Sequence, residues 1–161
     1  MLALVSRLDA DWYTPRTYVV AATDALGPSK ASAAEAAAAR PPPTVAVLPR
    51  AREVGQSYMS SVWTTLVALA AAVALVWRAA PDLLLVNGPG TCVPVVAAAV
   101  AARLLGRSRT RVVYVESIAR TRTLSLTGRI LYGGRLADAF FVQWPGLAAA
   151  LPRAMYAGRL Y

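Results

Sequence analysis

Three short, mostly apolar runs, each followed by a polar or glycine-containing turn, most constrain the fold of this chain. They cover residues 82–87, 111–115 and 139–143. Each run is apolar on both faces, which is typical of strands buried between two layers of helices. The segments between them, 93–105 and 124–136, have the composition of helices. This alternation predicts an α/β fold with a Rossmann-like open parallel sheet of the doubly wound type.

The first third of the chain adds two strands and one helix to this prediction. Residues 17–23 and 44–48 are β-branched and apolar runs bounded by proline or aspartate, as strands are. Residues 29–39 are alanine-rich, begin with a serine and end before the three prolines at 41–43. This pattern predicts a short helix followed by an extended linker.

The amino-terminal residues indicate that one strand is missing from this pattern. Residues 1–8 look like the later part of a helix, although a doubly wound sheet usually begins with its central strand and a glycine-rich turn. We therefore expect the sheet to lack its first strand. A chain of 161 residues has about half the length that a two-lobed enzyme needs, so we expect residues 1–161 to form one Rossmann-like domain.

Charge and rare residue types limit the possible chemistry. Seventeen lysines and arginines against 8 acidic residues give a net charge of +9, which favours phosphate-bearing partners. The chain has no histidine and one cysteine, Cys92, which excludes a His-based triad, a His/Cys zinc site and an intrachain disulfide. We expect no metal and no cofactor. Nucleic acid is not an expected partner either, because basic and aromatic residues are not interleaved and no reading helix is recognisable.

Residues 62–77 form a stretch of sixteen residues without a charge, with Trp63 and Trp77 near its two ends and Arg78 directly after it. As a helix this stretch would be about 24 Å long, which is shorter than the roughly 30 Å hydrocarbon core of a bilayer. The length therefore favours a buried or interfacial helix over one that spans a membrane.

The turn after residues 82–87 is a candidate anion-binding loop. Its residues are Asn87, Gly88, Pro89, Gly90 and Thr91, and they lie where a strand ends and a helix begins. Unpaired backbone amides and the helix dipole favour a negative charge at such a point. The glycines allow a phosphate to approach the backbone, and Thr91 can cap the helix. A purely structural turn would have the same sequence.

A second group of polar residues follows the strand predicted at 111–115. Glu116 and Ser117 come directly after it, and Arg120 and Arg122 follow. Because ligands of open α/β sheets bind at the carboxyl ends of the strands, Glu116 is a candidate base or sugar ligand, and the arginines are candidate diphosphate ligands. The alternative is a structural acid that pairs with its arginine neighbours. Trp144, after the next strand, is either a stacking platform or a core residue.

The carboxyl terminus is a short segment with two aromatic residues. Tyr156, Gly158, Arg159, Leu160 and Tyr161 are the residues that we single out there. Such a segment either folds back onto its own domain or binds another protein.

Several motifs in the same order resemble one known family, the asparagine-linked glycosylation protein 14 family, and the resemblance extends over nearly the whole chain. The motifs are WYTPRTYVVAATD (12–24), REVGQSYM (52–59), DLLLVNGPGTCVP (82–94), VVYVESIARTRTLSLTGRILY (112–132), ADAFFVQWPGL (137–147) and MYAGRL (155–160).

This resemblance implies a subunit of the UDP-N-acetylglucosamine transferase of N-linked glycosylation. The family supplies the amino-terminal, acceptor-side half of a GT-B glycosyltransferase that is split between two chains. Its partner, a soluble subunit of the asparagine-linked glycosylation protein 13 type, binds the nucleotide sugar. The family anchors this partner at the cytosolic face of the endoplasmic reticulum membrane. The complex adds the second N-acetylglucosamine to dolichol-diphosphate N-acetylglucosamine, and this chain is expected to be inactive alone.

The resemblance also assigns roles to residues of this chain. Residues 88–91 match an acceptor-side loop, Glu116 and Arg120 match the same cleft, and residues 156–161 match the region that binds the partner. The family usually has a membrane-anchoring helix, a strand and a glycine-rich loop ahead of the position that matches Met1. Two alternatives stay open: a non-catalytic recruitment scaffold, and a split transferase for another lipid-diphosphate glycan such as a capsular polysaccharide.

Overall fold

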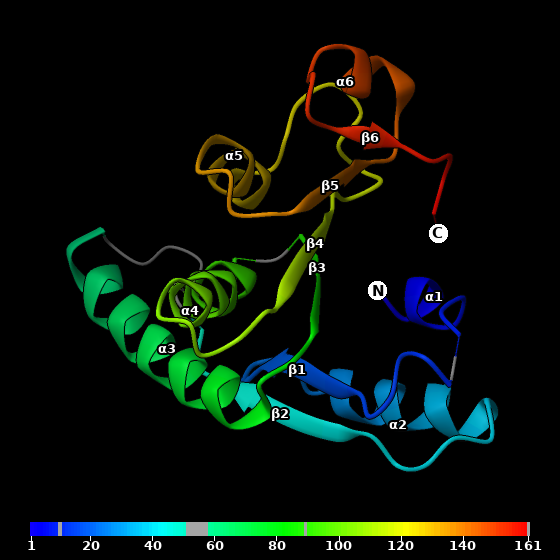
Figure 1. The fold of residues 1–161 in the computed structure, drawn as a ribbon, viewed down its shortest axis with the longest axis vertical. Coiled ribbons are helices and arrows are strands. Elements are labelled where there is room, and N and C mark those ends of the chain that lie inside the picture. Colours follow the sequence, from blue (N-terminus) through cyan, green and yellow to red (C-terminus); the bar gives the residue numbers. More distant parts are fainter. Residues whose placement is uncertain (10, 51–57, 89, 161) are drawn as a thin grey trace.

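A four-stranded parallel sheet forms the centre of the chain in the computed structural model, which describes residues 1–9, 11–50, 58–88 and 90–160. Its strands are β3 (Leu83–Asn87), β4 (Arg111–Val115), β5 (Ala139–Val142) and β6 (Met155–Tyr156). They pair in chain order, β3-β4-β5-β6 (Figure 1). The α/β fold with parallel strands is therefore confirmed.

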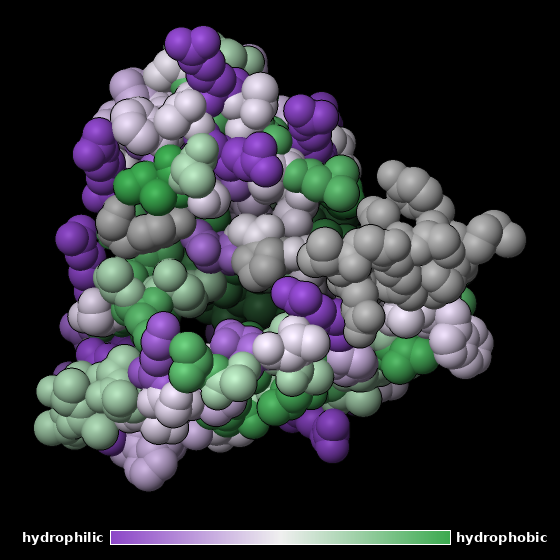
Figure 2. Space-filling model, turned by 180° about the vertical axis from the view of Figure 1, so that it is seen from behind, coloured by the Kyte–Doolittle hydropathy of each residue, from purple (hydrophilic) through white to green (hydrophobic). Residues whose placement is uncertain are grey.

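Two further strands, β1 (Thr17–Ala21) and β2 (Thr44–Leu48), pair with each other in a separate parallel sheet. A single continuous sheet, as the sequence suggested, is not formed. In the common doubly wound order, the first strand of the fold is central and pairs with a strand on each side. The corresponding position in this chain lies between β1 and β3, and no strand of the described residues fills it. Seen from behind, a hollow with apolar side chains at its floor opens near the middle of the molecule (Figure 2).

Helices α3 (Tyr58–Ala79) and α4 (Cys92–Leu104) lie side by side along the strands, across from α1 (Leu2–Val5) and α2 (Gly27–Ala37) (Figure 1). The hydrophobic core lies where α3 and α4 pack against the strands. Its α4 residues, such as Val96, Ala98 and Ala99, are almost completely buried. Such small side chains let the two helices approach closely, and packing of this density stabilises the layer.

Most predicted elements are present, with shifted ends. α2 begins two residues before the predicted 29, where the carboxylate of Asp24 accepts a hydrogen bond from the amide of Gly27 (2.9 Å). The helix predicted at 124–136 is the shorter α5 (Leu126–Gly133), which Ser125 caps by accepting from the amide of Gly128 (3.0 Å). The sequence did not indicate α6 (Pro145–Ala149) or the two-residue strand β6.

Helix α3 is longer than the uncharged stretch at 62–77, whose length favoured a buried or interfacial helix over a spanning one. α3 has 22 residues, which corresponds to about 33 Å at 1.5 Å per residue. Its segment Val62–Ala79 is long and apolar enough to span a bilayer, by length and composition alone. The helix nevertheless packs against α4 along one face, and few residues of this segment are buried. It is therefore not a fully buried core helix.

A buried carboxylate holds α2 against β1. Glu35 of α2 is 3% exposed and accepts hydrogen bonds from Tyr18 and from Arg16 (3.2 Å), with Arg40 at 3.5 Å. Burial alone would raise the pKa of Glu35, but the hydrogen bonds and the two guanidinium charges lower it below its ordinary value. Burial and the neighbouring Glu35 raise the pKa of Tyr18 to about 12. Glu35 is therefore charged in the folded chain at neutral pH.

Replacing Glu35 with glutamine is expected to lower the free energy of unfolding by about 2 kcal/mol, because it leaves two partly buried guanidinium groups without their counter-charge. A carboxyl group whose pKa is lowered by folding stabilises the fold above its unfolded pKa, and this contribution is lost as the pH falls through the folded pKa. The difference between wild type and Glu35→Gln, measured by urea unfolding, should therefore be full at pH 7 and shrink at acidic pH. Asp11→Asn, which alters an exposed carboxylate, is the control, and an equal effect of both variants would contradict the prediction.

Candidate functional site

The register of β3 and β4 brings the two predicted loops together. The strands pair in parallel from Leu83 opposite Arg111 to Asn87 opposite Val115. Both chains therefore leave the sheet at the same carboxyl edge, and the side-chain amide of Asn87 donates to the carbonyl oxygen of Val115 (3.0 Å). The loop that begins at Gly88 and the loop that begins at Glu116 start as neighbours.

The turn between β3 and α4 is compact and open to solvent. Gly88 has φ +73°, a backbone conformation that side chains disfavour, and a Cβ atom there would meet no other atom within 4 Å. Gly90 is exposed, and Thr91 is the N-cap of α4 but makes no side-chain capping bond. Pro89 lies outside the described residues. The amide end of α4 is thus not covered by the Thr91 hydroxyl.

Cys92, the first residue of α4, is not a nucleophile at neutral pH. Burial raises the pKa of its thiol to about 11, although a backbone hydrogen bond from Asn87 opposes the shift. A protonated thiol at this position contributes packing rather than chemistry.

Several hydrogen bonds hold Glu116 at this edge. Its side chain is fully buried, with an exposed fraction of 0%. One carboxylate oxygen accepts from the Tyr114 hydroxyl (3.1 Å) and the Ser117 amide (2.8 Å). The other accepts from both the amide (2.9 Å) and the hydroxyl (3.1 Å) of Ser125. The carboxylate therefore ties the end of β4 to the start of α5, and the catalytic assignment of Glu116 stays a prediction.

The two arginines of the same loop point outward. Arg120 and Arg122 are exposed, and among the described residues no ion pair joins either of them to Glu116. Ser117 shapes the loop instead, because its hydroxyl accepts from the amide of Ala119 (3.3 Å) and its carbonyl oxygen accepts from the amide of Arg120 (3.0 Å). Exposed arginines of this kind suit an anion such as a diphosphate where free backbone amides lie close by.

The sequence model of the family described as "Oligosaccharide biosynthesis protein Alg14 like" matches residues 1–160. The chain belongs to the Alg14 family.

Characterised members of the Alg14 family share much of this sequence. The protein named "UDP-N-acetylglucosamine transferase subunit ALG14" from Rattus norvegicus is 44% identical over 167 residues, which cover 99% of this chain and 76% of the rat protein. The proteins of that name from Homo sapiens and Yarrowia lipolytica are 43% and 42% identical, with 92% and 99% of this chain and 71% and 74% of the relatives covered. No solved structure matches. The names of these relatives describe a subunit of a glycosyltransferase, so the family is active as part of a complex.

The carboxyl-terminal residues fold back onto the sheet in this member of the Alg14 family. Buried Gln143 accepts from the amide of Leu160 (2.9 Å) and donates to the carbonyl oxygen of Glu116 (3.5 Å). The guanidinium of Arg159 lies over the ring of Trp144 (4.8 Å), and the indole N–H of Trp144 donates to the carbonyl oxygen of Ile118 (2.8 Å). The ring of Trp144 is thus covered on one side by its own chain.

The remaining residues of the predicted partner-binding segment differ in their setting. Tyr156 belongs to the edge strand β6 and is 45% exposed. Gly158 has φ +80°, which lets the chain turn back toward Trp144. Tyr161 lies outside the described residues. The link from Leu160 through Gln143 to Glu116 connects the tail with the candidate site, and sequence reasoning did not single out Gln143.

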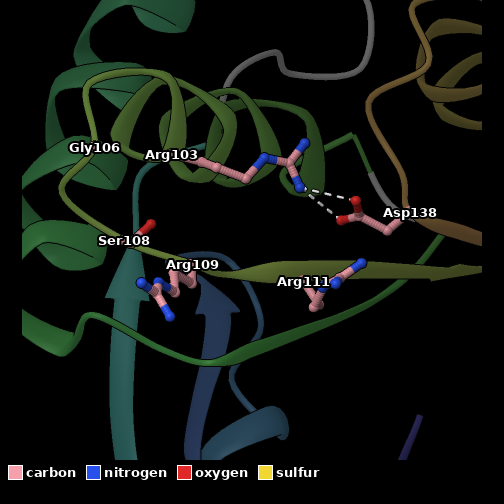
Figure 3. A pocket seen from close by; sticks show the side chains of 6 residues that line it. All are labelled: Arg103, Gly106, Ser108, Arg109, Arg111 and Asp138. Atoms are coloured by element: carbon pink, nitrogen blue, oxygen red, sulfur yellow. Dashed lines mark hydrogen bonds and ion pairs between the residues drawn. The ribbon is translucent and has the colours of Figure 1, made fainter.

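A pocket of about 670 Å³ lies at the opposite, amino-terminal edge of the sheet. Arg103 of α4 reaches both carboxylate oxygens of Asp138 (2.9 and 2.8 Å), while Arg109 points away from this pair (Figure 3). Burial would raise the pKa of Asp138, but hydrogen bonds from the Val112 amide and Arg103 lower it. The pair fixes the end of α4 to the start of β5 and is remote from the candidate site.

Gly128 of α5 provides a test of the Glu116 network. A Cβ atom at Gly128 would lie 2.3 Å from Oε2 of Glu116, so Gly128→Ala is expected to push this buried carboxylate off its hydrogen bonds. We expect a loss of about 1–3 kcal/mol of unfolding free energy, measured by thermal or urea unfolding.

Gly133→Ala is the matched control, because Gly133 lies in the same helix and a Cβ atom there meets nothing within 4 Å. That variant is expected to be neutral or slightly stabilising, since alanine favours a helix more than glycine does. Equal stability of the two variants would show that the Glu116 network does not need the space at Gly128.

Proposed function

We propose that this chain is the acceptor-side subunit of a two-subunit UDP-N-acetylglucosamine transferase. In this proposal residues 1–161 act as one domain that binds dolichol-diphosphate N-acetylglucosamine, to which the complex adds a second N-acetylglucosamine. A soluble partner of the asparagine-linked glycosylation protein 13 type supplies the nucleotide sugar at the cytosolic face of the endoplasmic reticulum membrane. Membership of the Alg14 family and the names of its relatives support this proposal.

The observation that carries the acceptor role is the meeting of two loops at one sheet edge. Asn87 and Val115 are neighbours in register, so the loop that leads to the uncapped amino end of α4 and the loop that carries the exposed Arg120 and Arg122 leave the sheet side by side. A diphosphate carries its negative charge over several oxygens, and it needs both N–H donors and cations when it leaves water. We assign diphosphate binding to Asn87, Gly88, Pro89, Gly90, Thr91, Ser117 and Arg120.

Glu116 fits a positioning role better than a role as the base. Its carboxylate has no exposed surface and already accepts four hydrogen bonds. A general base must come within hydrogen-bond reach of the hydroxyl group from which it takes a proton. These four hydrogen bonds fix the carboxylate of Glu116, and Glu116 in turn sets the path of the loop that carries Arg120.

Docking of the partner is assigned to the tail, with Tyr156, Gly158, Arg159, Leu160 and Tyr161. The exposed edge strand β6, which contains Tyr156, offers unpaired backbone groups to a second protein. Because the tail is bonded to Gln143 and through it to the Glu116 carbonyl, binding there is coupled to the candidate acceptor loop.

The acceptor role predicts that Gly88→Ala impairs transfer. An alanine at φ +73° is strained by about 1–2 kcal/mol, and the turn amides shift to relieve the strain. We expect the efficiency of transfer from UDP-N-acetylglucosamine to a phytanyl-diphosphate N-acetylglucosamine acceptor, with the partner co-expressed, to fall about tenfold or more.

Gly106→Ala is the control for this experiment. Gly106 has φ +69° and a similarly open environment, but it lies at the opposite edge of the sheet, next to the Arg103 pocket. It should lose similar stability and keep full transfer activity. If both variants are equally active while the complex stays intact, the chain acts as a recruitment scaffold; if only another lipid-diphosphate glycan is elongated, the acceptor assignment changes.

Glu116→Gln separates positioning from proton transfer. A glutamine cannot accept all four hydrogen bonds, so we expect a loss of about 1–3 kcal/mol of unfolding free energy, with a raised KM for the acceptor and a pH profile of kcat of unchanged shape. Loss of a general base would instead lower kcat about 100-fold or more at unchanged KM and remove one limb of that profile. Steady-state kinetics of the complex over pH distinguish the two outcomes.

A further inference from the structure

One face of α3 is an exposed apolar stripe. Its residues follow one another at intervals of one, three or four, which places them on one side of a helix. They are Trp63, Leu66, Val67, Ala70, Ala74 and Trp77. Trp63 is 71% exposed and Leu66 52%, and the stripe contains no charged residue. Exposed apolar residues on this scale mark an interaction surface.

The opposite face of α3 is already occupied. Ala68, Ala72 and Val76 are buried, four residues apart, on the side where α3 packs against α4. A spanning helix would need lipid or other membrane-embedded protein around its whole circumference. The orientation of α3 along α4 therefore favours burial of the stripe alone.

Arginines and leucines continue the stripe beyond the carboxyl end of α3. Leu104 and Leu105, at the end of α4, are 81% and 68% exposed. The guanidinium of Arg107 lies 5.3 Å from the ring of Trp77, and the exposed Arg78 directly follows that tryptophan. Apolar side chains bordered by arginines match the layering of a membrane surface, where lipid phosphates lie above the acyl chains.

We propose that α3 lies in the plane of an anionic membrane, with this stripe at the boundary between headgroups and acyl chains. Arg78 and Arg107 bind the lipid phosphates. Trp63 and Trp77 are separated by fourteen residues, about 21 Å along the helix, and both lie on the stripe, where the preference of tryptophan for the membrane interface applies to each. Charge complementarity identifies the occupant as a lipid surface rather than an apolar protein groove.

This orientation of α3 adds to the proposed function, and its biological meaning rests on that function. α3 ends at Ala79, four residues before β3 begins, so its carboxyl end lies at the amino-terminal edge of the sheet. Its amino end, near Trp63, points toward the edge with Gly88 and Glu116. A helix in the membrane plane keeps that edge beside the lipid, where a lipid-linked acceptor resides.

Co-sedimentation of the purified chain with vesicles tests this inference. One set of vesicles contains phosphatidylcholine alone, and the other contains phosphatidylcholine with a minor fraction of phosphatidylserine. We expect Trp63→Ser to weaken binding to both sets about tenfold, and Arg78→Glu to weaken binding about tenfold only where phosphatidylserine is present. Both side chains are exposed, so circular dichroism should show unchanged thermal unfolding.

Trp12→Ser and Arg7→Glu are the matched controls, since Trp12 is 85% exposed and Arg7 is exposed outside this surface; they should bind like wild type. Equal binding of Trp63→Ser and Trp12→Ser would overturn the proposal. So would a self-association in the absence of lipid that Trp63→Ser abolishes, which would identify a second copy as the occupant. Association that resists alkaline carbonate and ignores charge reversal would indicate a spanning helix instead. The assay contains no donor, acceptor or partner, so its failure leaves the transfer proposal untouched.

Discussion

The parallel pairing of β3 with β4 is the constraint on which the rest of the structure depends. Its register ends both strands at the same level, with Asn87 opposite Val115. A slip of one residue would turn the buried side chains of Val86 and Tyr114 to the other face of the sheet. The cost of exposing them holds the register, and the register holds the two loops together. Any chemistry at this edge is thus a consequence of how the strand interiors are packed.

In the candidate site, buried groups and exposed groups have different roles. Buried Glu116 and Gln143 organise backbone, the first by binding Ser125 and the second by binding Leu160. In the proposed acceptor site, the groups that would meet an anion are backbone amides and the exposed Arg120 and Arg122. An anion site of this kind stabilises a phosphate without any titrating group. Such a division suits a subunit that holds an acceptor while a partner supplies the donor.

Elements defined by continuous apolar runs could be predicted, and those defined by distant contacts could not. β2 and β4 have the predicted ends because prolines or polar residues bound their runs. α3 begins four residues before the stretch at 62–77, since polar residues such as Ser60 are compatible with a helix. The sequence does not reveal the hydrogen-bond partners of Glu116, because Ser125 comes close to it only when α5 folds back against β4. Asp138 and Arg103 are 35 residues apart, and β6 is too short to leave a pattern.

The distribution of side-chain size on α3 explains why sequence alone left its environment open. Its buried face carries Ala68 and Ala72, whereas its exposed face carries Trp63, Leu66 and Trp77. A helix of a water-soluble domain normally buries its largest apolar side chains, each of which gains about 1.5–3 kcal/mol when removed from water. Hydropathy cannot separate the two faces, because alanine, leucine and tryptophan all occur in an uncharged stretch. Packing against α4 does separate them, because it buries the face with small side chains. The larger apolar side chains are left exposed, where contact with water is unfavourable.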